Sequence, residues 1–167
     1  MSQQAANPWL FTPADVAASV AITSIAGLGA SALVTTASAH GLAERAPISI
    51  QGVTGAGVIY NGGYKIVSVP STTTFYIALA VPSVVASGAV GNVLTAAYLA
   101  MLRAEQITWS GATAADTLLL TDCHGNVIWN PTAGLADTPY VSAKVFWVGP
   151  GLVVNALPHG NVQITVN

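Results

Sequence analysis

The stretch TTASAHGLAERAPISIQGVTGAG, residues 35 to 57, joins two runs of small, β-prone residues and holds one of the chain's three histidines. Its His40-Gly41-Leu42 is followed closely by Glu44 and Arg45, in a chain with only four basic and six acidic residues. Two interpretations compete, an active site and a corner of the fold. The pattern on either side of the stretch favours the corner.

Short β-prone runs flank this stretch in both directions and recur every eight to twelve residues or so. Gly, Pro, Ser and Asn clusters separate them, which is typical of turns between strands. This spacing leaves no room for crossover helices, so the sequence predicts an all-β barrel or sandwich. The runs are VAITSI, ALVTTA, PISIQGV, YKIVSV and TTFYIAL.

The chain divides into three segments on this pattern. Residues 1–19 read as an N-terminal arm, because Pro8 and Pro13 break regular structure while Trp9 and Phe11 supply apolar anchors for a groove. That groove belongs either to the same chain or to a neighbouring subunit, and we expect a partner contact. Residues 20–93 form a small β-barrel, with a domain boundary or linker at 81–93, where small residues are frequent. Residues 94–167 form a second, sandwich-like β domain.

Two features mark that second domain. The segment LTAAYLAMLRAEQITW, residues 94 to 109, mixes helix formers with a β-prone end, and we expect a short helical turn running into a strand, with residues 94–103 open to either assignment. The segment DTLLLTDCHGNVIWN, residues 116 to 130, is a hairpin signature with Asp122, Gly125 and Asn126 as its turn residues.

Charge is the anomaly of the composition. Only 6% of the residues are charged, against about a quarter in an ordinary soluble domain. With a net charge of −2 and only four scattered basic residues, the chain has no basic patch that could bind nucleic acid. The surface is therefore either neutral and polar or largely buried against copies and partners. We favour burial, because an uncharged free surface promotes self-association.

The uncharged residues 16–34 are the candidate membrane span. Residues 66–102 and 145–167 are also uncharged, so the lack of charge does not distinguish this span from the rest of the chain. Ala, Ser, Gly and Thr dilute it and no Lys/Arg asymmetry flanks it, so we expect no membrane segment. The first residues also lack the basic start of a secretory signal.

Asp122-Cys123-His124 contains an acid, a nucleophile and a base in three consecutive positions. Neighbours in a hairpin diverge, whereas a catalytic triad converges from separate segments, so a structural turn is the better interpretation. The His and Cys spacings match no metal motif, and no spacing favours a carboxylate pair among the acids. We therefore expect no enzyme and no catalytic, cofactor or metal residues. The acids considered are Asp15, Glu44, Glu105, Asp116, Asp122 and Asp137.

Residues 35–80 resemble a small β-barrel module of tailed-bacteriophage virion proteins. The resemblance rests on HGL, YNG followed by Tyr64, and TTF at their mutual distances, and covers under a third of the chain. It implies structural turns at His40-Gly41-Leu42 and Tyr60-Asn61-Gly62, with Leu42 closing the barrel end and Glu44 and Arg45 in solvent. Two departures are the AERAP loop after HGL and a second glycine, Gly63. The other matching residues are Thr35, Thr36, Ile48, Ile50, Gly52, Ile66, Val69, Thr74 and Phe75.

The second half, from Trp109 to Trp129, is more loosely similar to β domains of small phage structural proteins. The resemblance implies a virion structural protein, most simply a decoration or cement protein. Its expected partners are the major capsid protein and copies of itself, without nucleic acid or membrane. A neck, tail or baseplate component is the alternative within this class. A glycan-binding module, with Trp9, Trp109, Trp129 and Trp147 as sugar platforms, is the alternative from another class.

Overall fold

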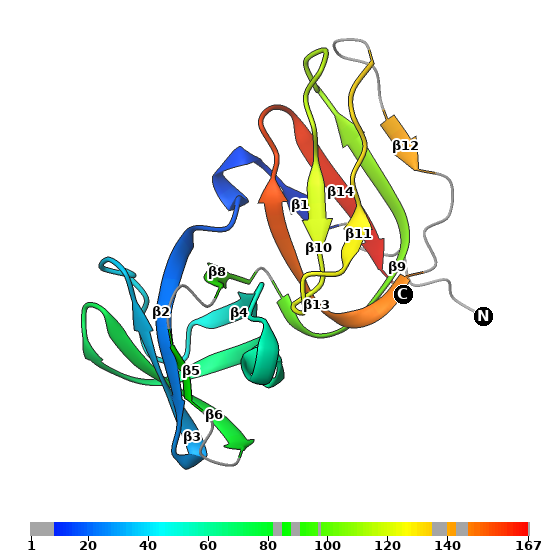
Figure 1. Ribbon diagram of the computed structural model, residues 1–167. Coiled ribbons are helices and arrows are strands. Elements are labelled where there is room, and N and C mark those ends of the chain that lie inside the picture. Colours follow the sequence, from blue (N-terminus) through cyan, green and yellow to red (C-terminus); the bar gives the residue numbers. More distant parts are fainter. Residues whose placement is uncertain are drawn as a thin grey trace.

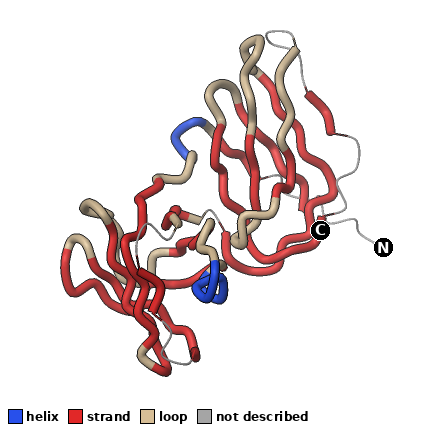
Figure 2. The backbone as a smooth tube through the Cα atoms, in the orientation of Figure 1, coloured by secondary structure: helices blue, strands red, loops and turns tan. Residues whose placement is uncertain are grey.

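The computed structural model describes residues 9–81, 85–87, 91–96, 98–134, 140–142 and 147–166. They form two β domains, a barrel of residues 19–95 and a second domain that contains both ends of the described chain (Figure 1). Two short 3-10 helices, η1 (Pro13–Asp15) and η2 (Gly55–Tyr60), are the only helical segments in these ranges (Figure 2). The all-β class predicted from the sequence is confirmed.

The first domain is a closed antiparallel barrel of six strands, in the order β3-β6-β5-β4-β8-β2, with β2 pairing back to β3. A further strand, β7, pairs with β2. Strand β2 therefore has three neighbours, since its first residues pair with β8 and its later residues with both β3 and β7. The strands are β2 (Ser19–Gly27), β3 (Gly29–Thr36), β4 (Pro47–Gln51), β5 (Gly62–Ser71), β6 (Thr74–Val81), β7 (Val85–Ser87) and β8 (Asn92–Thr95).

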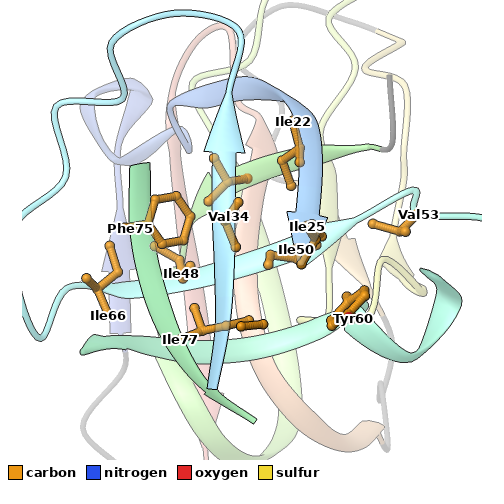
Figure 3. Close-up of a cluster of buried hydrophobic side chains, with 12 residues drawn as sticks. Ile22, Ile25, Val34, Ile48, Ile50, Val53, Tyr60, Ile66, Phe75 and Ile77 are labelled. Atoms are coloured by element: carbon orange, nitrogen blue, oxygen red, sulfur yellow. The ribbon is translucent and has the colours of Figure 1, made fainter. Parts of the chain in front are cut away.

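Isoleucine fills most of the barrel interior (Figure 3). In β4, Ile48 and Ile50 point inward, as the two-residue period of a strand requires, and both are fully buried. They meet Phe75 and Tyr60, the largest side chains of the same core. Burying each such side chain contributes about 1.5–3 kcal/mol, which makes this cluster the main source of barrel stability.

The second domain has the strand order β1-β14-β9-β13-β10-β11, with β12 also paired to β9. Strand β13 pairs with β9 through its first half and with β10 through its second half. A register shift lies between Pro150 and Leu152, where Gly151 has a φ of 75°. Such a bulge lets one strand pass between two sheets, which gives a sandwich-like domain. The strands are β1 (Trp9–Phe11), β9 (Tyr98–Ser110), β10 (Leu119–Thr121), β11 (Val127–Trp129), β12 (Tyr140–Ser142), β13 (Trp147–Ala156) and β14 (Asn161–Val166).

The expected linker at 81–93 is wrong in part. Residues 85–87 form β7, and β8 begins at Asn92 and completes the barrel between β4 and β2. Residues 82–84 and 88–90 lie outside the described ranges. The glycines at 88 and 91 suggested a break between strands. The NVLT run that follows nevertheless forms a strand, because it pairs with both β4 and β2. The barrel therefore ends after Thr95 rather than at 93.

The expected helical turn in residues 94–103 is also wrong. Residues 98–110 form one strand, β9, which pairs with β13 through 98–104 and with β14 through 104–110. Helix propensity is a weak preference of a few tenths of a kcal/mol per residue, and pairing with β13 overrides it.

The expected arm belongs largely to the second domain. Strand β1 pairs antiparallel with β14, and Trp9 and Phe11 pack half-buried against the core of their own chain. Their rings stand edge to face, with centroids 6.5 Å apart. The barrel is thus inserted between the first strand of the second domain and the rest of it. Residues 1–8 lie outside the described ranges.

Candidate functional site

His40 forms the corner between β3 and β4. Its backbone N–H donates to the Thr72 carbonyl at 3.0 Å, and its Nδ1 accepts a hydrogen bond from the Leu42 N–H at 3.0 Å. Between them, Gly41 has a φ of 62°, in the left-handed region that favours glycine. The imidazole thus bonds the neighbouring backbone N–H of Leu42, and Gly41 supplies the left-handed backbone of this corner.

The His40 ring has a structural role in the barrel. It is buried and stands edge to face with Phe75 of the barrel core, with ring centroids 5.3 Å apart. Because Nδ1 accepts, the neutral ring carries its proton on Nε2, which is buried and has no hydrogen-bond partner among the described residues. Leu42 packs against the barrel core, as expected. Glu44 and Arg45 are exposed, as expected of solvated loop charges.

The Tyr60-Asn61-Gly62 corner follows the short helix η2. Tyr60 is fully buried, and burial raises the pKa of its phenol. The Asn61 amide spans the corner, accepting from the Val53 N–H at 2.9 Å and donating to the Val53 carbonyl at 2.8 Å. The Asn61 side chain therefore holds this corner together through the backbone of Val53.

Asp122 organises the turn between β10 and β11. Its carboxylate accepts hydrogen bonds from the backbone N–H groups of His124 and Asn126, each at 2.8 Å, and from the Asn126 side chain at 2.8 Å. Gly125 has a φ of 88° in this turn. The carboxylate is fully engaged by its own turn, so Asp122, Gly125 and Asn126 are turn residues as predicted.

Cys123 lies fully buried between the two domains, in a small cluster with Leu94, Ala96 and Val153. Burial, together with the negative charge of Asp122, raises the pKa of its thiol to about 11. A nucleophilic cysteine needs the opposite shift, toward the thiolate. This environment favours the structural interpretation of Asp122-Cys123-His124 over the catalytic one.

A polar latch joins the barrel to this turn, and we define it as Ser49, Gln51, Thr121, Asp122 and Cys123. The Ser49 hydroxyl donates to the Cys123 carbonyl at 2.7 Å. The Gln51 Nε2 lies 3.2 Å from the Thr121 hydroxyl and 3.1 Å from the Asp122 carbonyl. Because Ser49 and Gln51 alternate with Ile48 and Ile50 along β4, one face of this strand fills the barrel while the other contacts the second domain.

Gly63 allows the two domains to approach each other beside the latch. A Cβ at this position would lie 2.9 Å from Leu99 Cδ2 and 3.0 Å from both Cβ and Sγ of Cys123. Such distances are shorter than side chains tolerate. The second glycine, which departs from the phage-module pattern, is therefore explained by the domain contact.

A cleft of about 490 Å³ opens next to the latch, between the domains. Its walls come from the barrel and from the β10–β11 turn, and its lining is mostly polar. The lining residues are Ser19, Gln51, Gly52, Asn61, Asn92, Leu94, His124 and Gly125. A second pocket, of about 410 Å³, lies at the His40 corner and is mainly apolar.

The other acids have local roles where the structure describes them. Asp15 accepts from the N–H and hydroxyl of Thr12. Asp116 accepts from the Thr113 N–H at 2.7 Å and pairs with His159 Nδ1 at 2.9 Å. Within the described ranges, His, Cys, Asp and Glu form no group of three that could hold a metal ion. In the same ranges, no helix is long and apolar enough to span a membrane. Asp137 is outside them.

The tryptophans do not form an open sugar platform in the described part of the chain. Trp109 is fully buried and donates from Nε1 to the His159 carbonyl at 2.9 Å. Trp9 and Trp129 pack half-buried against the same core. The Trp147 side chain lies outside the described residues. Core burial was the expectation for these residues.

No family model matches the sequence, and no curated protein or solved structure matches it. The latch and the cleft were not found from the sequence, since Ser49, Gln51, Ser19 and Asn92 stand in no motif. The doubled glycine at 62–63 was the one signal that pointed to this place.

Proposed function

We propose that the protein is a structural component of a tailed-bacteriophage particle, most simply a decoration or cement protein on the capsid. It would work by adhesion between the major capsid protein and copies of itself, and it would reside in the virion. The proposal starts from the HGL, YNG and TTF resemblance. In this fold the first two motifs form corners, and Phe75 of the third lies in the barrel core.

The observation that carries the proposal is a nearly uncharged exterior with apolar side chains on it. Among the described residues, the exposed ionised side chains are Asp15, Glu44, Arg45 and Lys65. Large apolar side chains are exposed on both domains. They are Leu10, Leu28, Val58, Ile59, Val67 and Val127, between 42% and 59% exposed. A neutral, partly apolar surface suits extended protein contacts, in which charged residues are depleted at the centre.

Strand β1 supports a revised version of the partner contact expected at Trp9 and Phe11. The two aromatics face their own core, so the side chain available to a neighbour is Leu10, which is 56% exposed on this edge strand. In our proposal the Trp9–Phe11 strand still contacts the partner, through its outer face, which carries Leu10.

Quantitative mass spectrometry of purified particles from the source phage tests the placement. Hundreds of copies per particle would support a capsid-covering protein, and about a dozen would support the neck, tail or baseplate alternative. Absence from the particle would sink the virion proposal.

The Leu10 contact has its own test. Leu10→Glu should fold normally but decorate particles poorly, whereas Thr132→Glu, at an exposed polar residue of the same domain, should decorate them as the native protein does. Equal decoration by both variants would contradict a contact through β1.

A further inference from the structure

The cleft between the domains has the size and position of a ligand site. At about 490 Å³ it falls in the range of small-molecule pockets, and such pockets occur preferentially at domain interfaces. Nothing in the adhesive role of the protein requires it. We therefore asked which of its polar groups remain available to a ligand.

Two of the cleft's amides are already engaged. Both ends of Asn61 bond the backbone of Val53, and the Gln51 Nε2 is held within the latch. Three other side chains, those of Ser19, Asn92 and His124, are exposed and make no hydrogen bond to another described residue. They come from β2, β8 and the β10–β11 turn, so both domains contribute.

The uncharged character of the described lining indicates which kind of ligand the cleft can bind. Among the described residues, no Lys, Arg, Asp or Glu lines the cleft, so this lining has no fixed partner for a phosphate, a carboxylate or an amine. A hydroxyl, an amide and a neutral imidazole each donate and accept hydrogen bonds. The apolar Leu94 adds a surface for C–H groups. This combination matches a neutral molecule with many hydroxyls.

A peptide strand fits less well. Two of the barrel strands that border the cleft are already paired on both sides, since β4 lies between β5 and β8, and β8 lies between β4 and β2. A peptide would find no free edge on these two strands, and strand addition depends on such an edge.

We propose that this cleft binds a short neutral carbohydrate through Ser19, Asn92 and His124. The latch prepares the site, because the 2.7 Å bond from Ser49 to the Cys123 carbonyl fixes the turn that carries His124 against the barrel. A preformed site loses less conformational freedom on binding, which favours affinity. The proposal is independent of the protein's position in a particle.

The test uses the full chain on an array of neutral and acidic oligosaccharides, followed by titration of the best neutral hit. Asn92→Ala/His124→Ala should weaken binding at least tenfold. Both side chains are exposed, so the fold should not change, and thermal unfolding would verify this. The matched control is Asn161→Ala/His159→Ala, exposed residues of the same types outside the cleft lining, which should bind like the native protein.

Three outcomes would overturn the proposal. They are no neutral oligosaccharide binding at all, binding that survives Asn92→Ala/His124→Ala, and preferential capture of acidic sugars. Binding of extended peptides instead, lost in the cleft variant, would overturn the carbohydrate assignment in favour of a peptide.

Discussion

The two domains differ in how the chain assembles them. The barrel is closed by strands that all lie within residues 19–95, whereas the second domain needs β1, from before the barrel, to pair with β14 at the other end of the chain. The barrel can therefore close from contiguous sequence. The second domain is complete only when two distant segments meet, which makes it the part with the more demanding topology.

The aromatic residues allow this difference to be measured. All four tryptophans, at positions 9, 109, 129 and 147, lie in the second domain, and the barrel has none. Tryptophan fluorescence therefore reports the second domain alone, while far-ultraviolet circular dichroism reports both. Any variant in the barrel that moves the fluorescence transition does so through the contact between the domains.

The largest effect is expected from Phe75→Ala. Phe75 is fully buried in the barrel core and also supports the His40 ring, so its truncation should cost about 3–5 kcal/mol of unfolding free energy. Because the latch joins the domains, urea unfolding followed by fluorescence should shift together with circular dichroism. A fluorescence transition that stays at its native midpoint would show that the domains unfold independently.

Gly63→Val should come next, because its side chain would press on Leu99 and Cys123 at the domain contact. Overpacking of this kind costs about 1–3 kcal/mol, and here the easiest relief is to separate the domains. We expect one unfolding transition to split into two. Gly134→Val is the control, since a Cβ there meets nothing within 4 Å. An unsplit transition at the native midpoint would contradict the close contact at Gly63.

The buried Cys123 thiol predicts a loss of stability in alkali. Its pKa is about 11 in the folded protein, against 9.0 for the ordinary thiol, so above about pH 9 the unfolded chain releases its proton first. Stability should be unaffected by this group below pH 9 and fall as the pH rises through about 11. By linkage the full loss of unfolding free energy, for a difference of about two pKa units, is about 3 kcal/mol.

Cys123→Ala should remove that part of the pH dependence. Tyr64, whose pKa burial and the neighbouring Tyr60 raise to about 12, should still cause a fall above pH 10. Unfolding midpoints measured from pH 8 to 10.5 compare the two proteins. An identical slope for both between pH 9 and 10 would contradict a protected thiol.

Local and distant determinants explain which features could be predicted. The corners at His40, Asn61 and Asp122 each contain side-chain bonds between residues at most eight apart, and the sequence indicated all three. Alternation in PISIQ likewise assigns Ile48 and Ile50 to one face and Ser49 and Gln51 to the other. The outer face of this strand contacts residues about 70 positions away in the sequence, and no local pattern predicts those contacts.

The same reason accounts for the errors. The helix formers of residues 94–103 become strand because β13, some 50 residues later, pairs with them. The glycines near residue 90 suggested a linker because the neighbours of β8, at residues 19–21 and 48–51, are equally remote. Trp9 and Phe11 read as a free arm since their partner strand is the last one in the chain.

The smallest effect, and the most specific one for the contact between domains, is expected from Ser49→Ala. The change removes the donor to the Cys123 carbonyl and one neighbour of Gln51 Nε2, but leaves both hydrophobic cores intact. A lost buried hydrogen bond costs about 1–2 kcal/mol, so the fluorescence midpoint should fall modestly. Ser24→Ala, a half-buried serine on β2, serves as the control within the barrel. If both variants shift the fluorescence midpoint equally, the latch does not couple the domains, and the apolar cluster around Cys123 alone must hold them together.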